Sequence, residues 1–248
     1  MRGLHGRSIV VTGASSGIGE GIAERLAAVG AHLTLGSRTA PQVSGDNVHW
    51  IQTDVAEPGQ ADALIAGAVE RFGQLDGLVN NAGVQIEKTI ADTSDDEFDL
   101  VIGVNVRGVF NCSRAAVRSM QQGSGGSIVN IGSIAGDTAD HGMAIYNASK
   151  GAVHAMTRAI ATDHGADGIR CNAVAPGWVA TALAEAAFEL ADDPAAAREH
   201  AVSAHPVGRL GTPADIANIV AWLLSDEAGF TTGSVFRVDG GLTAGSPI

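Results

Sequence analysis

The stretch that decides the fold is SIVVTGASSGIG, residues 8–19. Its first part, Ser8–Thr12, is a short run rich in β-branched residues, which is typical of a buried strand. The glycines that follow allow a sharp turn, and apolar residues at helical spacing from Ile18 to Val29 then predict a helix. Gly30 stands where a glycine would end that helix. The stretch therefore predicts a strand, a tight turn and a helix in succession.

The same alternation of strand and helix continues through the rest of the chain. β-Branched apolar runs predict the strands, and apolar residues at helical spacing predict the helices between them. Repeated strand–helix–strand units imply parallel pairing, because the helix carries the chain back to the start of the next strand. The sequence thus predicts a single-domain α/β fold over residues 1–248, a Rossmann-type, doubly wound, seven-stranded parallel sheet with helices on both faces. The other predicted strands are His32–Leu35, Val48–Gln52, Leu75–Asn80, Ser127–Ile131, Ile169–Ala175 and Ser234–Val238, and the later predicted helices are Gln60–Phe72, Asp95–Met120, Tyr146–Thr162 and Thr212–Leu224.

The composition indicates a compact protein whose partners are small molecules. The formal net charge is -12 and the Lys and Arg residues form no cluster, so no footprint for nucleic acid or an anionic membrane is present. Cys112 and Cys171 stand in no metal or redox spacing, which predicts two buried thiols in a reducing compartment. The 8 histidines also lack ligand spacing, so we expect no metal site. With no signal peptide and no apolar run of membrane-spanning length, we expect a cytoplasmic protein.

Three glycines in the first turn form a candidate site for the pyrophosphate of a dinucleotide. Gly13, Gly17 and Gly19 let the backbone approach a ligand closely, and the N–H groups at the start of a helix attract phosphate. The spacing GxxxGxG differs from the common GxGxxG fingerprint, and no Lys-Ser/Thr pair follows, which argues against a nucleoside-triphosphate loop. A turn that simply needs small residues is the alternative interpretation.

The cofactor preference is expected at the end of the second strand, where NAD-binding sites place an acid against the ribose 2′-hydroxyl. The residues at this point are Gly36, Ser37 and Arg38, and no Asp or Glu appears before Asp46. Arg38 and the Ser37 hydroxyl could meet a 2′-phosphate, so NADP is favoured over NAD. The alternative is that Arg38 is a solvated surface charge.

Tyr146 and Lys150 form the candidate catalytic pair. They are four residues apart, which places them on one face of a helix, and Tyr146 is the only tyrosine of the chain. A phenol has a pKa near 10 and is a poor base at neutral pH, but a neighbouring ammonium favours the phenolate. The alternative is an exposed lysine one turn away from a packed tyrosine.

Two further polar residues are candidates for the same chemistry. Ser133 ends a predicted strand at the edge where a doubly wound sheet binds its ligand, although a serine in such a turn is often only a turn residue. Asn105 shares helical spacing with Phe98, Ile102 and Val109, which would place an amide on an otherwise apolar face. A buried amide needs partners, so a structural hydrogen bond and a role in holding a water are both open.

Together these residues resemble the classical short-chain dehydrogenase/reductase (SDR) family, and the resemblance extends from Val10 to residues 239–241. The spacing of tyrosine and lysine differs from that of the family's enoyl-reductase branch, where the two are further apart. The motifs that carry the resemblance are Thr12-Gly13 with Gly17-Ile18-Gly19, Asp54-Val55, Asn80-Asn81-Ala82-Gly83, Asn105, Ser133, Tyr146 with Lys150, and Pro176-Gly177 followed by Thr181.

The resemblance implies an NAD(P)-dependent oxidoreductase that transfers a hydride between the nicotinamide and an alcohol or carbonyl carbon. It implies that Tyr146 is the acid–base, Ser133 orients the substrate oxygen and Asn105 positions a water in a proton relay. Lys150 would hold the nicotinamide ribose and lower the pKa of Tyr146. The residues expected to bind the cofactor are Gly13, Ser15, Ser16, Gly17, Ile18, Gly19, Ser37, Arg38, Asp54, Val55, Asn81, Ala82, Gly83, Tyr146, Lys150, Pro176, Gly177, Val179 and Thr181.

Two segments and the assembly need separate expectations. The segment between Arg38 and Val48 is short and contains Pro41 and Gly45, so the helix usual there in the family is expected to be missing or reduced to a turn. Residues 178–209 lie outside the alternation and are rich in Ala, Glu and Leu, which predicts a helical substrate lid, with a packing helix as the alternative. The family resemblance implies a homotetramer, with a dimer as the other possibility.

The substrate is expected to occupy a partly apolar pocket near the strand ends. Two other functions compete with the oxidoreductase: a catalytically silent NAD(P)-binding regulatory protein, and a nucleotide-sugar epimerase or dehydratase. The complete set of polar catalytic candidates argues against the first, and the lack of a larger C-terminal substrate domain argues against the second. The candidate pocket residues are Gln85, Ile134, His141, Trp178, Leu183 and Phe188.

Overall fold

The computed structural model describes residues 2–245, which fold around one seven-stranded parallel sheet. The strand order is β3-β2-β1-β4-β5-β6-β7, so the chain winds outward from β1 and then, on the other side, from β4. This topology confirms the predicted Rossmann-type single domain, of which Met1 and residues 246–248 lie outside the described residues. The strands are β1 (Ser8–Thr12), β2 (His32–Ser37), β3 (Val48–Gln52), β4 (Gly77–Asn80), β5 (Gly126–Ile131), β6 (Ile169–Pro176) and β7 (Val235–Val238).

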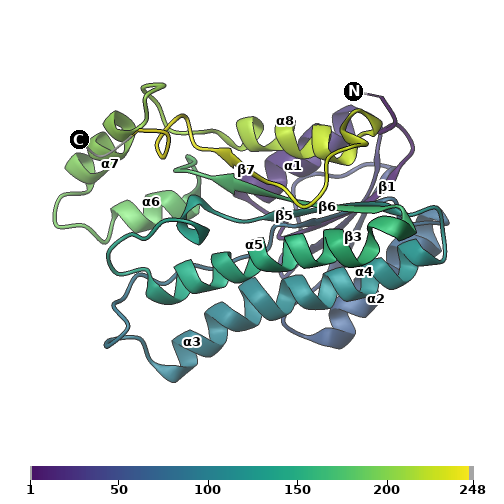
Figure 1. Ribbon diagram of the computed structural model, residues 1–248, viewed down its shortest axis with the longest axis horizontal. Helices are drawn as coiled ribbons and strands as arrows, with labels where there is room; N and C mark the ends of the chain where they lie inside the picture. The colour runs from purple at the N-terminus through teal and green to yellow at the C-terminus, as the bar shows by residue number, and fades with distance from the viewer. Residues whose placement is uncertain (1, 246–248) are drawn as a thin grey trace.

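Helices cover both faces of the sheet, with α1 and α8 on one face and α2, α4 and α5 on the other (Figure 1). No helix within residues 2–245 is long and apolar enough to cross a membrane. The predicted lid contains two helices, α6 and α7. The helices are α1 (Gly17–Ala28), α2 (Pro58–Phe72), α3 (Asp95–Ile102), α4 (Val109–Gln121), α5 (Ala144–His164), α6 (Ala182–Phe188), α7 (Pro194–Ala204) and α8 (Pro213–Leu224), and shorter turns lie at Gly103–Gly108 (π), Ile134–Gly136, Gly165–Asp167 and Asp226–Ala228 (3-10).

A hydrophobic layer fills the space on each side of the sheet. Adjacent strand residues point to opposite faces, so Val11 packs with Leu26 on the side of α1 and α8, and Val10 packs on the side of α2 and α4. Cys112 and Cys171 are buried free thiols in this second layer, as predicted. Burial on both faces explains why the strands are continuous apolar runs rather than alternating ones.

The long helix predicted over Asp95–Met120 is interrupted. A π-helical turn, Gly103–Gly108, joins α3 to α4 and changes the direction in which successive side chains point. The predicted apolar face is therefore wrong at its start: Asn105 and Val109 are buried, but Phe98 is 44% exposed. The π-turn places Asn105 between the sheet and α5.

Residues typical of helix starts and ends correctly predicted several segment boundaries. Gly30 follows α1 with a φ of +78°, a left-handed conformation that a glycine adopts without strain. Thr212 and Asp215 form a capping box at the start of α8. No helix occurs between Arg38 and Val48, as expected, and the chain there forms only turns and irregular backbone.

Candidate active site

A cavity of about 860 Å³ opens at the carboxyl ends of the strands. Segments that follow β1 to β6 supply its walls, together with the start of α1 and parts of α5 and α6. Two predicted site residues, Gly19 and Asn105, do not line it and are buried in the structure. The predicted residues that do line it are Gly13, Ser15, Ser16, Gly17, Ile18, Ser37, Arg38, Asp54, Val55, Asn81, Ala82, Gly83, Ser133, Tyr146, Lys150, Pro176, Gly177, Val179 and Thr181.

The glycine-rich turn leaves the start of α1 open to the cavity. Gly13 and Gly17 have φ values of +65° and +59°, and a Cβ on Gly19 would lie 2.2 Å from the Gly13 carbonyl oxygen. Ser16 precedes the helix, but its side chain makes no capping hydrogen bond. Free N–H groups at the positive end of a helix suit an anion, so the turn fits a pyrophosphate.

Asn81 holds this turn in place. Its Nδ2 donates to the carbonyl oxygens of Thr12 and Gly13, both at 3.0 Å. The Thr12 hydroxyl in turn accepts hydrogen bonds from the backbone N–H of Asn81 and of Ala82. The amide of Asn81 is thus used within the chain, and its contribution to a ligand is to fix the shape of the turn.

The end of β2 presents Arg38 to the cavity. Its exposed guanidinium makes no ion pair or hydrogen bond with residues 2–245. The Ser37 hydroxyl, by contrast, donates to the Thr39 carbonyl oxygen at 2.7 Å and accepts from Trp50 Nε1 at 3.1 Å. The hydroxyl hydrogen of Ser37, which was expected to contact the 2′-phosphate, is therefore already used in a hydrogen bond within the chain. Arg38 is then the side chain that is available to an anion at this point.

Tyr146, Lys150 and Ser133 meet where α5 passes the end of β5. Lys150 Nζ donates to the Ile131 carbonyl oxygen at 2.9 Å and lies 5.6 Å from the centre of the Tyr146 ring. Only 6% of Lys150 is exposed, so the alternative of an exposed lysine is wrong. The Ser133 hydroxyl accepts from the backbone N–H of Ala135 and forms a hydrogen bond with Tyr146. The predicted cluster is thus assembled.

The pKa of Tyr146 does not follow the expectation from the resemblance. Burial raises the pKa of the phenol above its usual value, and the hydrogen bond with Ser133 offsets only part of that rise. The net pKa of Tyr146 is therefore raised and not lowered as expected, because desolvation is the largest effect on the phenol, while burial lowers the lysine's own pKa to about 8. At neutral pH the tyrosine therefore keeps its proton.

Asn105 makes structural hydrogen bonds from the π-turn. Its Oδ1 accepts from the Val84 N–H at 2.9 Å, and its Nδ2 donates to the Val84 carbonyl oxygen and to Ser149 Oγ. The amide thereby ties the segment after β4 to α5, next to Lys150. The structural interpretation is confirmed by these contacts.

Known proteins match the chain over nearly its whole length. A family model described as Enoyl-(Acyl carrier protein) reductase matches residues 13–243. 2-(S)-Hydroxypropyl-CoM dehydrogenase 3 of Xanthobacter autotrophicus is 38% identical over 97% of this chain and 98% of its own. The ligand-free structure of Thermoplasma acidophilum aldohexose dehydrogenase has a TM-score of 0.94 and 36% identity, and the match covers 99% of this chain and 97% of that one.

The chain belongs to the short-chain dehydrogenase/reductase family. As a member it is an NAD(P)-dependent oxidoreductase that acts on alcohol or carbonyl groups. Two more relatives bear similar names: 2,5-dichloro-2,5-cyclohexadiene-1,4-diol dehydrogenase of Sphingobium indicum, 37% identical over 98% of this chain and 100% of its own, and levodione reductase, with a TM-score of 0.92, 33% identity and coverage of 98% and 99%. Neither a silent binding protein nor an epimerase is favoured by these matches.

The candidate pocket residues of this short-chain dehydrogenase/reductase divide into two groups. Gln85, Ile134, Trp178 and Leu183 line the cavity, as expected. His141 does not line it and is exposed to solvent, and Phe188 is buried behind Trp178, with ring centroids 5.0 Å apart. Asp140 and Met143, which the sequence did not single out, line the cavity beside this group.

His154 is a buried residue beside the Ser133 turn that sequence reasoning missed. It lies one turn beyond Lys150 on α5, and its side chain is buried. A Cβ on Gly132 or Gly136 would lie 2.3 and 2.6 Å from the His154 ring, so the ring packs against both sides of the Ser133 turn. Its Nδ1 is 3.2 Å from Asp137 Oδ1. The spacing from Tyr146 and Lys150 was the signal that could have found it.

Proposed function

We propose that Tyr146 is the acid–base of this oxidoreductase. In the reductive direction its hydroxyl protonates the substrate oxygen as that oxygen gains charge, and in the oxidative direction the phenolate takes the proton back. The observation that carries the proposal is a phenol that lines the cavity, contacts Ser133 and lies next to the Lys150 ammonium, with a raised pKa that keeps it protonated at neutral pH. A neutral phenol is the form that can donate.

The neighbouring residues have supporting roles in this mechanism. Ser133 orients the same substrate oxygen, since its hydroxyl already contacts Tyr146. Lys150 holds the nicotinamide ribose and, with a pKa of about 8, carries a positive charge at neutral pH that favours the phenolate in oxidation. Asn105 ties the segment after β4 to α5 and in that place positions a water of the proton relay.

The cofactor occupies the carboxyl edge of the sheet in this proposal. The open start of α1 binds the pyrophosphate, Asp54 and Val55 flank the adenine, and the segment from Pro176 to Thr181, which includes Gly177 and Val179, contacts the nicotinamide side. When bound, the dinucleotide donates or accepts the hydride. NADP is favoured over NAD, because the unpaired Arg38 guanidinium suits a 2′-phosphate and no acid occupies its place.

Residues 178–209 form the substrate lid. Ala182 and Leu183 at the start of α6 line the cavity, and α6 packs through Phe188 on a small hydrophobic cluster with α7 that is separate from the two main layers. A helix pair with its own small core can move without disrupting the sheet. The lid would exclude water from the reacting atoms when closed.

The active form is a homotetramer, or a dimer, in the cytoplasm, with a small alcohol or carbonyl compound as its partner and no nucleic acid or membrane. The family resemblance supports the assembly, and so do Phe98, Leu100 and Phe110, three exposed apolar side chains on α3 and α4. Light scattering coupled to size exclusion tests the proposed oligomer, and a monomeric mass would contradict it.

The acid–base role is tested with Tyr146→Phe, which removes one hydroxyl and retains the ring. We expect turnover of ketone and secondary-alcohol substrates to fall by about 10²–10⁴-fold, the usual contribution of a positioned acid–base. Dinucleotide affinity should stay within about twofold, because the phenol does not bind the pyrophosphate or adenosine. Turnover near that of the wild type would rule out the assigned role.

The cofactor preference is tested by nicotinamide fluorescence titrations of NADPH and NADH on the wild type and on Arg38→Ala. We expect NADPH to bind roughly tenfold to a hundredfold more tightly than NADH, and the variant to lose that advantage, because a charge-assisted hydrogen bond contributes about 1.5–3 kcal/mol. Arg118→Ala, on the exposed surface of α4, controls for the loss of one positive charge. Equal or tighter binding of NADH by the wild type contradicts the preference.

A further inference from the structure

We propose that the substrate is a neutral ring compound that carries hydroxyl groups, and that Asp140 selects it. The proposal rests on the proposed function, since it concerns the substrate of the same cavity. It follows from the chemistry of the cavity's substrate end. By this we mean lining residues from the segments after β4, β5 and β6 and from α6 that lie outside the glycine-rich, catalytic and cofactor groups named above: Val84, Gln85, Ile134, Ala135, Asp140, Met143, Trp178, Ala182, Leu183, Ala184 and Ala186.

The substrate end has no positive charge to offer an anion. The charged side chains that line the cavity, among residues 2–245, are Arg38, Asp54, Asp140 and Lys150. Arg38 and Asp54 follow β2 and β3, which β1 and β4 separate from β5 and β6. Lys150 belongs to the catalytic cluster, and its Nζ is bonded to the Ile131 carbonyl oxygen. A substrate carboxylate, phosphate or sulfonate would therefore meet only the like charge of Asp140, which is unfavourable.

The polar groups of the substrate end are mainly hydrogen-bond acceptors. The Asp140 carboxylate is exposed and forms no hydrogen bond or ion pair with residues 2–245. Gln85 Nε2 donates to Glu87 Oε1 at 2.6 Å, and its own Oε1 accepts no hydrogen bond from those residues. An ionised carboxylate can only accept, so its complement is a donor. A hydroxyl group is a donor without charge.

The rest of the substrate end is apolar and includes a flat aromatic wall. Trp178 lines the cavity, and Phe188 stacks behind it with ring centroids 5.0 Å apart and an interplanar angle of 28°. Ile134, Met143 and Leu183 complete the apolar surface. A rigid aromatic face packs well against the C–H face of a ring, and the acceptors then bind hydroxyls at the ring's edge.

The test uses three compounds with one ring and one reacting hydroxyl: cyclohexane-1,2-diol, cyclohexanol and 2-hydroxycyclohexanecarboxylate. Their dissociation constants are measured by calorimetry on the protein saturated with whichever reduced dinucleotide it binds more tightly, a complex that cannot oxidise an alcohol. We expect the diol to bind roughly tenfold more tightly than cyclohexanol, as one hydrogen bond to a charged group allows, and the carboxylate to bind most weakly.

Asp140→Asn tests the contribution of the carboxylate apart from that of the rest of the pocket, because it removes the charge and keeps the shape of the side chain. We expect the ratio of diol affinity to carboxylate affinity to fall by about fivefold to tenfold. Asp163→Asn, a matched loss of an exposed carboxylate near the far end of α5, should leave the ratio unchanged.

Three results would overturn the inference: equal binding of diol and cyclohexanol, tightest binding of the carboxylate, or an unchanged ratio in Asp140→Asn. Turnover with the oxidised dinucleotide is measured separately on the same compounds. Binding in the expected order without turnover of any of them contradicts the proposed function and supports the inference. Turnover with the wrong binding order contradicts the inference alone.

Discussion

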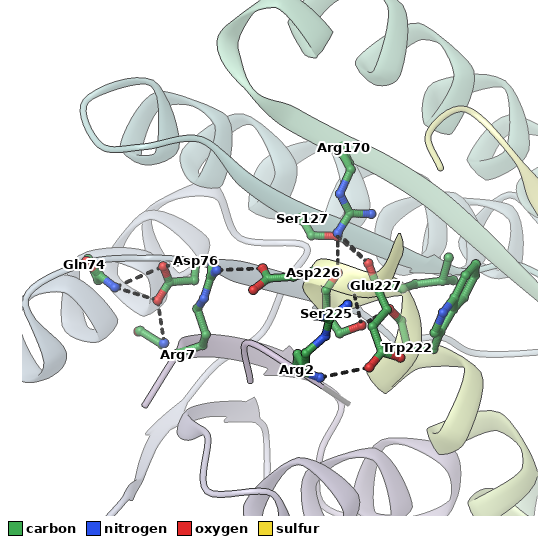
Figure 2. Close-up of polar contacts among 12 residues, drawn as sticks. Arg2, Arg7, Gln74, Asp76, Ser127, Arg170, Trp222, Ser225, Asp226 and Glu227 are labelled. Atoms are coloured by element: carbon green, nitrogen blue, oxygen red, sulfur yellow. Dashed lines mark hydrogen bonds and ion pairs between the residues drawn. The ribbon is translucent and has the colours of Figure 1, made fainter. Parts of the chain in front are cut away.

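Charged side chains at the amino edge of the sheet are paired with other groups of the chain, whereas some charged side chains at the carboxyl edge are left open. At the amino edge, side chains bind each other and the backbone where the strands begin (Figure 2). Asp76 accepts the backbone N–H of Ser8 at 2.8 Å, at the start of β1. Arg170, at the start of β6, donates to the carbonyl oxygens of Leu223 and Ser225 at the end of α8. This edge is held together by the chain alone.

At the carboxyl edge, polar groups of the same kinds face the cavity. The start of α1 has no side-chain cap from Ser16, and the side chains of Arg38 and Asp140 make no hydrogen bond or ion pair with residues 2–245. Unpaired groups at the ends of strands are available to a ligand, whereas the paired groups at the starts of strands stabilise the fold. Substitutions at the carboxyl edge should therefore change mainly ligand binding, and substitutions at the amino edge should change mainly the free energy of unfolding.

The largest effect is expected from Gly19→Ala at the carboxyl edge. The added Cβ would lie 2.2 Å from the Gly13 carbonyl oxygen and 2.4 Å from Asn81 Nδ2, so the turn must open. We expect dinucleotide affinity to fall by roughly a hundredfold, equivalent to about 2.7 kcal/mol, and stability to fall by about 1–3 kcal/mol. Fluorescence titration and urea unfolding measure the two losses.

Gly59→Ala is the matched control for that substitution. A Cβ on Gly59, in the first turn of α2, meets no atom within 4 Å, so the same change should leave binding intact and stability equal or slightly higher. Unchanged dinucleotide binding in Gly19→Ala would show that the turn is not the cofactor site.

The next largest effect is expected at the amino edge, from Arg170→Met. The guanidinium donates to the carbonyl oxygens of Leu223, Ser225 and Thr231, and methionine fills similar space without donors (Figure 2). We expect the free energy of unfolding to fall by about 2 kcal/mol, because partly buried acceptors lose a charged donor. Dinucleotide affinity of the folded protein should not change. A loss of affinity without a loss of stability would contradict the division between the two edges.

Local signals in the sequence were sufficient for most of the fold and for the central catalytic pair. The β-branched run and glycines of residues 8–19 determine a strand, a turn and a helix through contacts among near neighbours. Tyr146 and Lys150 are neighbours on one helix face, and a helix fixes that geometry wherever it packs. Such features depend on spacing alone, so they can be predicted from the sequence.

Other features depend on segments that are far apart in the chain. The Ser37 hydroxyl accepts from Trp50 Nε1 on the neighbouring strand, and the Tyr146 pKa is raised by burial that several elements create together. The π-turn at Gly103–Gly108 and the packing of His154 against Gly132 likewise follow from tertiary contacts. The helical spacing could have pointed to His154, but no local pattern contains what it packs against or the burial around Tyr146, which is why the expected tyrosine pKa was wrong.

A smaller effect is expected from the helix caps, where Thr212→Ala and Ser16→Ala form a matched pair. Thr212 Oγ1 accepts from the backbone N–H of Asp215 at 3.3 Å, whereas Ser16 makes no such bond. We expect Thr212→Ala to cost about 1 kcal/mol of stability and leave dinucleotide binding unchanged. Ser16→Ala should lower the free energy of unfolding by at most a few tenths of a kcal/mol. It should weaken dinucleotide binding by roughly threefold, which corresponds to the loss of one weak hydrogen bond. If Ser16→Ala instead lowered stability and Thr212→Ala weakened dinucleotide binding, the helix start available to the ligand would be that of α8 and not that of α1.

The smallest effect is expected from Asp226→Asn at the amino edge. Arg7 Nη2 lies 2.9 Å from Asp226 Oδ1, but both side chains are largely exposed, and Arg7 also lies 3.6 Å from Asp76. Exposed ion pairs contribute about 0–1 kcal/mol, and here the second carboxylate remains, so we expect a change below about 0.5 kcal/mol. Urea unfolding at low and at high salt measures it. A loss well above that value, abolished by salt, would mean that the exposed ion pairs of Figure 2 stabilise the amino edge, rather than the partly buried donors of Arg170.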